Sequence, residues 1–187
     1  MPAAEQRAKL GGRGVLVLFV AIFALNALWA MRHCEQLRPV GMGDIAPMVS
    51  LPLVDGSGER SLADLRGKVV LVDFWATWCK PCEMTIPVQK KLYEKYRAQG
   101  FEVFSINTDQ GKDAAARASE YAKGMGIPWP VLRDPDGSAG DLYKVESIPH
   151  MVIVDKLGVV RKVNIGLISI SKLQDDLDEA IRAALAR

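Results

Sequence analysis

The feature that most constrains this chain is a pair of cysteines, Cys79 and Cys82, that follows directly after a long apolar run. The run "KVVLVDFWA" (residues 68–76) is rich in β-branched side chains, which predicts a central strand buried on both faces. Residues 83–100 after the pair carry apolar side chains at helical spacing and end at a glycine. The two cysteines are therefore expected where a buried strand passes into a helix.

That position gives the two sulfurs different chemistry. If the helix begins near Cys79, its sulfur lies among the free N–H groups of the first turn, at the positive end of the helix dipole. A thiolate is stabilised there, and the pKa of such a cysteine falls from about 8.5 into roughly the 3.5–7.5 range. The cation of Lys80 favours the same thiolate, and Pro81 suits a first turn, where a missing N–H costs little. We therefore expect Cys79 to attack a disulfide and Cys82 to resolve the resulting mixed disulfide.

Two other uses of a cysteine pair fit the sequence less well. A structural zinc site needs four ligands, and beyond this pair the chain offers only Cys34, His33 and His150. A passive disulfide across a two-residue gap would close a very short loop and stabilise the fold little. Redox chemistry is therefore the better interpretation, and no metal site is expected.

The N-terminal part of the sequence is not expected to belong to a globular domain. Residues 15–31 form an apolar run broken by Asn26, and at about 17 residues the run is near the lower limit for spanning a bilayer. Basic residues flank it, with Arg7, Lys9 and Arg13 before and Arg32 and Arg38 after. This small excess favours a cytoplasmic N-terminus at residues 1–14, a transmembrane anchor and an extracytoplasmic remainder. A cleaved signal peptide is the alternative, although Leu28 stands where cleavage requires a small residue.

The rest of the sequence predicts one α/β domain. Residues 32–47 contain prolines and glycines with little periodicity and are expected to be a linker. In residues 48–187 a short strand pair turns at residues 55–58, strand and helix patterns then alternate, and a hairpin (150–166) and an amphipathic helix (169–186) close the chain. A mixed central sheet is expected. The net charge of +2 leaves no extended basic surface, which argues against nucleic-acid binding.

The stretch "VDFWATWCKPC" resembles the thioredoxin superfamily, and the wider pattern resembles the exported TlpA/ResA-type thiol-disulfide oxidoreductases. The resemblance covers residues 41–187. It includes "SIPH", which is similar to the loop whose proline is cis in this fold. It also includes residues 109–131, which look like the extra strand–helix insert that separates these proteins from plain thioredoxin. The resemblance therefore implies a thioredoxin fold with a TlpA/ResA-type insert.

The same resemblance assigns residues near the pair to substrate binding. The backbone of Ile148, followed by a cis Pro149, is expected to pair with an extended substrate segment by strand addition. Trp78 is expected to cover the disulfide, and Lys80 and Pro81 are expected to contact the substrate beside it.

Asp73 is the other informative residue, because it interrupts an otherwise apolar strand. It matches the buried acid of thioredoxin, which implies that its carboxyl has a raised pKa and accepts a proton from Cys82 during resolution. A strand-end aspartate whose hydrogen bonds are satisfied by neighbours is the alternative. Here the sequence departs from the family: many exported members have Asn at this position and Glu at the position of Thr85, and Ser105 replaces the lysine that accompanies the acid in thioredoxin.

The resemblance implies a membrane-anchored oxidoreductase that reduces disulfides of extracytoplasmic (periplasmic) proteins, for example apocytochrome c or a copper-site thiol pair. Its electrons would come from a membrane thiol-disulfide transporter, and no dissociable cofactor is expected beyond the Cys79–Cys82 couple, since no nucleotide or flavin motif is visible. Three alternatives remain: an oxidase that donates its disulfide; a Cu(I) chaperone that adds His150 or Met151 to the pair; and a peroxide-reducing enzyme, whose usual threonine-containing pattern is absent. His150 is also a candidate for tuning Cys79.

Overall fold

The computed structural model describes residues 3–37, 39–167 and 169–187. The chain divides into two units, Met1–Pro39 and Val40–Arg187. The first unit contains one helix, α1 (Ala3–Leu37). Its stretch Gly14–Met31 has a mean hydropathy of 2.3 and no buried residue, so it is long and apolar enough to cross a membrane. A signal sequence near the N-terminus shares these properties.

The expected linker, residues 32–47, is much shorter in the structure. α1 continues to Leu37, because the sequence after the apolar run contains no proline or glycine up to that residue. At the other end, the N–H of Gly43 donates to the carbonyl of Val160 at 2.8 Å, which ties this segment to the folded domain. The division between the two units therefore falls after Pro39, inside the expected linker.

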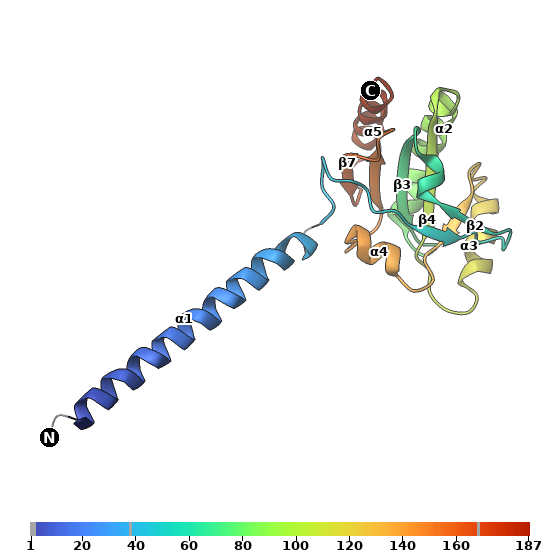
Figure 1. Cartoon of the computed structure of the whole chain (residues 1–187). Coiled ribbons are helices and arrows are strands. Elements are labelled where there is room, and N and C mark those ends of the chain that lie inside the picture. Colours follow the sequence, from blue (N-terminus) through green and yellow to red (C-terminus); the bar gives the residue numbers. More distant parts are fainter. Residues whose placement is uncertain (1–2, 38, 168) are drawn as a thin grey trace. The chain divides into compact units, whose positions relative to one another are not determined.

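The second unit is built on a mixed sheet, as the sequence predicted. Its strands are β3 (Val69–Trp75), β4 (Phe101–Asn107), β5 (Val131–Arg133), β6 (His150–Val154) and β7 (Val160–Ile165). The strand order is β5–β4–β3–β6–β7 (Figure 1). β3, β4 and β5 run parallel, whereas β6 is antiparallel to both β3 and β7. The predicted first hairpin forms a separate antiparallel pair, β1 (Ser50–Pro52) and β2 (Glu59–Ser61).

β3 takes the central position because its side chains suit burial on both faces. All of its residues are buried. Val72 and Phe74 face one hydrophobic cluster, and Leu71 faces the other. Asp73 is the one polar residue of this strand, and by alternation it lies on the side of Leu71.

Helices cover both faces of the sheet. On the side of Leu71 lie α2 (Lys80–Tyr96), which continues into η2 (Arg97–Gln99), and α5 (Ile170–Leu185). On the side of Phe74 lie the short helices η1 (Leu62–Leu65) and α4 (Ser138–Tyr143). The C-terminal amphipathic helix α5 begins where Ser169 caps it, since the Ser169 Oγ accepts the N–H of Lys172 at 3.2 Å.

The predicted insert, residues 109–131, contains α3 (Ala114–Gly124) and leads into β5. β5 pairs in parallel with the end of β4 and so adds an edge strand to the sheet. α3 buries small side chains, which allow it to pack closely: Ala114, Ala118 and Ala122.

Candidate active site

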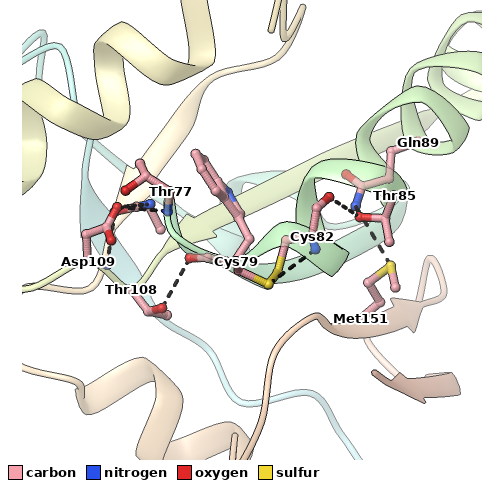
Figure 2. Close-up of a disulfide and its surroundings, with 10 residues drawn as sticks. Thr77, Cys79, Cys82, Thr85, Gln89, Thr108, Asp109 and Met151 are labelled. Atoms are coloured by element: carbon pink, nitrogen blue, oxygen red, sulfur yellow. Dashed lines mark hydrogen bonds between the residues drawn. A yellow bond between two sulfur atoms is a disulfide. The ribbon is translucent and has the colours of Figure 1, made fainter. Parts of the chain in front are cut away.

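The cysteine pair lies at the junction of β3 and α2. Cys79 is the N-cap residue of α2, and its Sγ accepts a hydrogen bond from the backbone N–H of Cys82 at 3.2 Å (Figure 2). The two sulfurs form a disulfide. The N-terminus of a helix carries unpaired N–H groups and the positive end of the dipole, so a thiolate released at Cys79 is stabilised there. Cys79 therefore occupies the helix-terminal position that the sequence predicted.

The two tryptophans beside the pair lie in different environments. Both cysteines are buried in an apolar cluster that includes Trp75, which is a core residue. Trp78 is 71% exposed, because it lies in the turn between β3 and α2, outside that cluster. Its side chain therefore projects largely into solvent.

The cation of Lys80, which was expected beside Cys79, pairs with a carboxylate on the same helix. Its Nζ contacts the Oε2 of Glu83 at 2.9 Å on the first turn of α2, and its side chain is exposed. The hydrogen bond and charge of Lys80 hold the pKa of Glu83 below its usual value. The ammonium is thus paired with a carboxylate in solvent. Pro81 lies in the first turn of the helix, where the sequence placed it.

The peptide bond between Ile148 and Pro149 is cis. The carbonyl of Pro149 accepts the N–H of Gly166 at 2.8 Å, which fixes this loop to the end of β7. Ile148 and Trp78, far apart in the sequence, together line a cavity of about 530 Å³. Its other walls are Thr108, Gln110, Asp134, Gly137, Gly140, Asp141, Val145, Glu146 and Ser147. The structure therefore brings two of the predicted substrate-binding residues to one cavity.

Asp73 is buried, with 3% of its surface exposed, and lies in the sheet between Ser105 on β4 and Met151 on β6. Burial raises the pKa of its carboxyl to about 7, an effect that the side chain of Gln89 partly offsets. Within the described part of the chain, its Oδ1 has no hydrogen-bond partner. Ser105, which stands opposite it, instead accepts the indole N–H of Trp75 at 2.8 Å. The alternative of a carboxyl fully satisfied by its neighbours is therefore not found.

Two polar residues lie behind Cys82; from the sequence, Thr85 stood out only as a departure from the family, and Gln89 was not singled out. The Thr85 Oγ1 donates to the carbonyl of Cys82 at 2.8 Å, and the Gln89 Nε2 donates to the Thr85 Oγ1 at 3.2 Å (Figure 2). Both side chains are buried on the inner face of α2. The helical spacing of these residues from Cys82 was the available signal, because it places them on the same face of the helix.

A second unpredicted contact fixes the turn before Cys79. The Oδ2 of buried Asp109 accepts the backbone N–H of Thr77 at 3.1 Å and the side-chain amide of Asn107 at 3.0 Å (Figure 2). The N–H and the hydroxyl of Thr108 donate to the carbonyl of Trp75. The end of β4 therefore holds the turn that carries the first cysteine. The sequence signal for this contact was the polar stretch "NTD" (residues 107–109) at the end of β4, which lies beside the carboxyl end of the parallel strand β3.

His150 lies on the other face of the sheet from Asp73. Its ring packs edge-on against Phe74 with centroids 5.9 Å apart, and burial lowers its pKa. Met151, the other soft ligand considered for copper, contacts Gln89 through its Sδ at 3.8 Å. Among the residues described, no three His, Cys, Asp or Glu side chains gather into a possible metal site. The side chain of Cys34 falls outside the described residues.

A disulfide across two intervening residues at a helix N-terminus, next to a cis-proline loop and held by a mixed sheet, is the arrangement shared by thioredoxin-like thiol-disulfide oxidoreductases. Comparison with known proteins agrees. Residues 42–163 match the AhpC/TSA family, and the chain belongs to this family.

The names of individual relatives describe thiol-disulfide exchange. The thiol-disulfide oxidoreductase ResA of Bacillus subtilis is 32% identical over 165 residues, which cover 85% of this chain and 87% of the relative. The thiol:disulfide interchange protein DsbE of Pseudomonas fluorescens is 34% identical over 170 residues, covering 88% and 92%. The crystal structure of a DsbE-like protein from Chlorobium tepidum superposes with a TM-score of 0.71 at 32% identity, covering 78% of this chain and 99% of that one. The chain is therefore a thiol-disulfide oxidoreductase with a thioredoxin-like fold, and its substrates are protein thiols or disulfides.

Proposed function

We propose that this oxidoreductase works as a reductant of disulfides in extracytoplasmic proteins, with α1 as its membrane anchor. The Cys79–Cys82 disulfide at the N-terminus of α2 supports thiol-disulfide exchange, and the charges around it favour the reducing direction. The strongest oxidants of this class are those whose reduced form is stabilised. Here the cation of Lys80 is paired with Glu83, and an ionised Asp73 would disfavour a second negative charge nearby. Both effects limit stabilisation of a Cys79 thiolate and favour a reducing potential.

In the proposed reaction the Cys79 thiolate attacks one sulfur of the substrate disulfide. A mixed disulfide forms, the substrate S–S bond breaks, and one substrate thiolate leaves. Cys82 then gives its proton to the carboxylate of Asp73, and its sulfur attacks the Sγ of Cys79. The bond between Cys79 and the substrate breaks, the second substrate thiolate leaves, and the Cys79–Cys82 disulfide forms. Two electrons pass to the substrate, whose thiolates take up protons from solvent, and Asp73 later releases its proton.

The cavity lined by Trp78 and Ile148 supports a role in holding the substrate segment. The backbone of Ile148, held by the cis bond to Pro149, would pair with an extended chain, while the exposed Trp78, Lys80 and Pro81 would contact residues that flank the reacting cysteine. The substrates we propose are cysteine pairs of apocytochrome c or of a copper site. A membrane thiol-disulfide transporter would return the dithiol to its reduced form, with no dissociable cofactor.

The first experiment is the reduction potential of the full-length protein in detergent, with Cys34→Ser so that the Cys79–Cys82 couple alone is measured. Equilibration with glutathione or dithiothreitol buffers gives the value. We expect a potential well below about −200 mV, as in reducing members of the class. A value near about −120 mV would instead identify an oxidase that donates its disulfide. Absence of any two-electron couple would contradict both the reductant and the oxidase. Retention of Cu(I) by the reduced protein would then be measured.

A second assay tests the substrate class. The reduced protein is mixed with an oxidised peptide that carries a C-x-x-C-H haem-attachment sequence, and thiol release is followed. We expect faster reduction than of oxidised glutathione, and Cys79→Ser should abolish it. Equal rates for both disulfides would exclude recognition of the peptide.

A further inference from the structure

A connected set of buried side chains lies behind Cys82, and the reaction described above makes no use of it. Thr85 and Gln89 are each 1% exposed, and they extend from the carbonyl of Cys82 toward the sheet (Figure 2). The chain of contacts ends at the Sδ of Met151, which Gln89 reaches through Nε2 at 3.8 Å. Met151 stands directly opposite Asp73 in the antiparallel pairing of β3 and β6. Gln89 therefore connects the first turn of α2 to the neighbourhood of Asp73.

The hydrogens available in this set can be counted. A threonine hydroxyl has one hydrogen, and Thr85 donates it to the carbonyl of Cys82, so Thr85 can only accept from Gln89. The two hydrogens of the Gln89 amide are directed at Thr85 and Met151. This leaves the Gln89 Oε1 as an acceptor. Within the described residues, both this atom and the Oδ1 of Asp73 are buried without a hydrogen-bond partner.

A buried acceptor without a donor is costly, and Gln89 and Asp73 each have one. A neutral carboxyl has an O–H that can donate to an amide oxygen, whereas a carboxylate only accepts. We propose that Gln89 is a positioning residue that follows the proton of Asp73. Its Oε1 accepts from the neutral carboxyl in the disulfide form, and its Nε2 donates to the carboxylate once the proton has left. The inference rests on the role proposed above for Asp73.

The rotation of the amide has a consequence at Cys82. When the Gln89 Nε2 turns to the carboxylate of Asp73, the Oε1 takes its place beside Thr85 and needs a hydrogen. The single hydroxyl hydrogen of Thr85 can meet that need only by leaving the carbonyl of Cys82. The protonation state of Asp73 is thus transmitted to the backbone of the resolving cysteine through two side chains.

The surroundings leave few other groups to compete with Gln89. From α2, the titratable groups on the helix face that Gln89 shares are Cys82 and, two turns further on, Tyr96, whose hydroxyl donates to Asp178 of α5 at 2.9 Å. β4 and β6 place Ser105 and Met151 beside Asp73, and α5 covers this side of the sheet with apolar side chains. In the part of the chain that the structure describes, no cation contacts Asp73. The amide of Gln89 also opposes the rise of the Asp73 pKa that burial causes.

The test follows the resolving step in the full-length protein with Cys34→Ser, in detergent. Reduced protein is treated with dithiobis(nitrobenzoate), an aromatic disulfide that forms a mixed disulfide on Cys79, and release of the second nitrothiobenzoate reports attack by Cys82. The rate is measured across the pH range on both sides of the Asp73 pKa. Gln89→Met keeps the volume but removes the donor to the charged carboxylate, so the midpoint should move up by about one pH unit.

A second variant gives the opposite sign. Thr85→Val removes the acceptor that holds the Gln89 amide in its present orientation, which frees Nε2 to donate to Asp73. The midpoint of the pH profile should therefore move down. A general loss of packing would not shift the midpoints of Gln89→Met and Thr85→Val in opposite directions. Gln99→Met, at an exposed glutamine in η2, is the matched control and should leave the profile unchanged.

Asp73→Asn separates the two proposals. If this variant keeps the wild-type pH profile, Asp73 is not the proton acceptor. The proposed role of Asp73 and the proposed role of Gln89 then both fail. If it abolishes the pH dependence while Gln89→Met and Thr85→Val follow the wild type, only the role of Gln89 is overturned. If Gln89→Met changes the rate as much in the Asp73→Asn background as alone, its effect does not pass through Asp73, and the inference is also overturned.

Discussion

At the scale of single residues, the ionisation of Asp73 links folding and chemistry. Its pKa is about 7 in the folded protein against 3.8 for an exposed aspartate. The folded state therefore binds this proton more tightly than the unfolded chain does. The neutral carboxyl therefore stabilises the folded state fully at pH values below 3.8. This stabilisation is lost as the pH rises through about 7. A shift of this size corresponds to roughly 4 kcal/mol, since one pKa unit is about 1.4 kcal/mol.

Asp73→Asn should remove this loss. The variant carries no charge to desolvate, so at alkaline pH we expect its free energy of unfolding to exceed that of the wild type by roughly 2–4 kcal/mol. The difference should vanish toward the pKa of an exposed aspartate. Urea titrations of the oxidised protein at several pH values, followed by tryptophan fluorescence, measure it. Asp175→Asn, an exposed position on α5, serves as the control, and equal pH dependence of Asp73→Asn and the wild type would contradict the expectation.

The sequence predicted those site residues whose positions follow from local patterns, and it missed those whose roles depend on contacts distant in the sequence. The positions of Cys79 and Cys82 follow from local patterns, a strand followed by a helix, and are visible in the sequence. The role of Gln89 depends on its contact with Met151, 62 residues away, and therefore on the pairing of β6 with β3. The pairing of Lys80 with Glu83 was within reach of helical spacing, because the two side chains share one turn.

At the scale of elements, the turn between β3 and α2 is held from β4. Asp109 accepts the backbone N–H of Thr77 at this turn, and a buried carboxylate that accepts two hydrogen bonds leaves both donors unpaired when it is removed. The strand register explains the contact, since Trp75 at the end of β3 pairs with Asn107 at the end of β4.

Asp109→Ala should destabilise the oxidised protein by roughly 2–3 kcal/mol, because a partly buried N–H and a buried side-chain amide lose their acceptor. Hydrogen exchange at the Thr77 amide should become faster. Asp109→Asn retains a side-chain oxygen and should cost less. Asp113→Ala is the matched control, because this exposed N-cap aspartate of α3 makes no side-chain capping bond. Unchanged protection of Thr77 in Asp109→Ala would show that the turn is held by other contacts.

Element boundaries were predicted less well than the elements themselves. The apolar run marked the part of α1 that could enter a membrane, but helix formation requires only the absence of breakers, so α1 continues to Leu37. Residues 40–47 carry prolines and glycines that suggest a linker, yet their backbone pairs with β7 and its turn. Such pairing depends on a partner more than 100 residues away and leaves no local pattern.

At the scale of the whole molecule, the candidate membrane-spanning stretch and the cysteine pair lie in different units of the chain. α1 precedes the domain and contains the only stretch among the described residues that is long and apolar enough to cross a membrane. The domain from Val40 onward contains the cysteine pair, the cis-proline loop and the cavity. The cysteine pair and the candidate membrane-spanning stretch therefore belong to separate units, and each can be tested without the other.

If α1 is an uncleaved anchor, the full-length protein should remain with membranes after extraction with alkaline carbonate, and its mass should match the complete chain. A chain restricted to residues 40–187 and exported with a foreign signal sequence should appear in the soluble fraction instead. Its reduction potential should equal that of the full-length protein, because the groups around Cys79 and Cys82 all lie within the second unit. Recovery of a shortened chain that starts within or just after residues 14–31 would show that the helix is a cleaved signal peptide. A changed potential would show that α1 affects the site, against the separation of the two units.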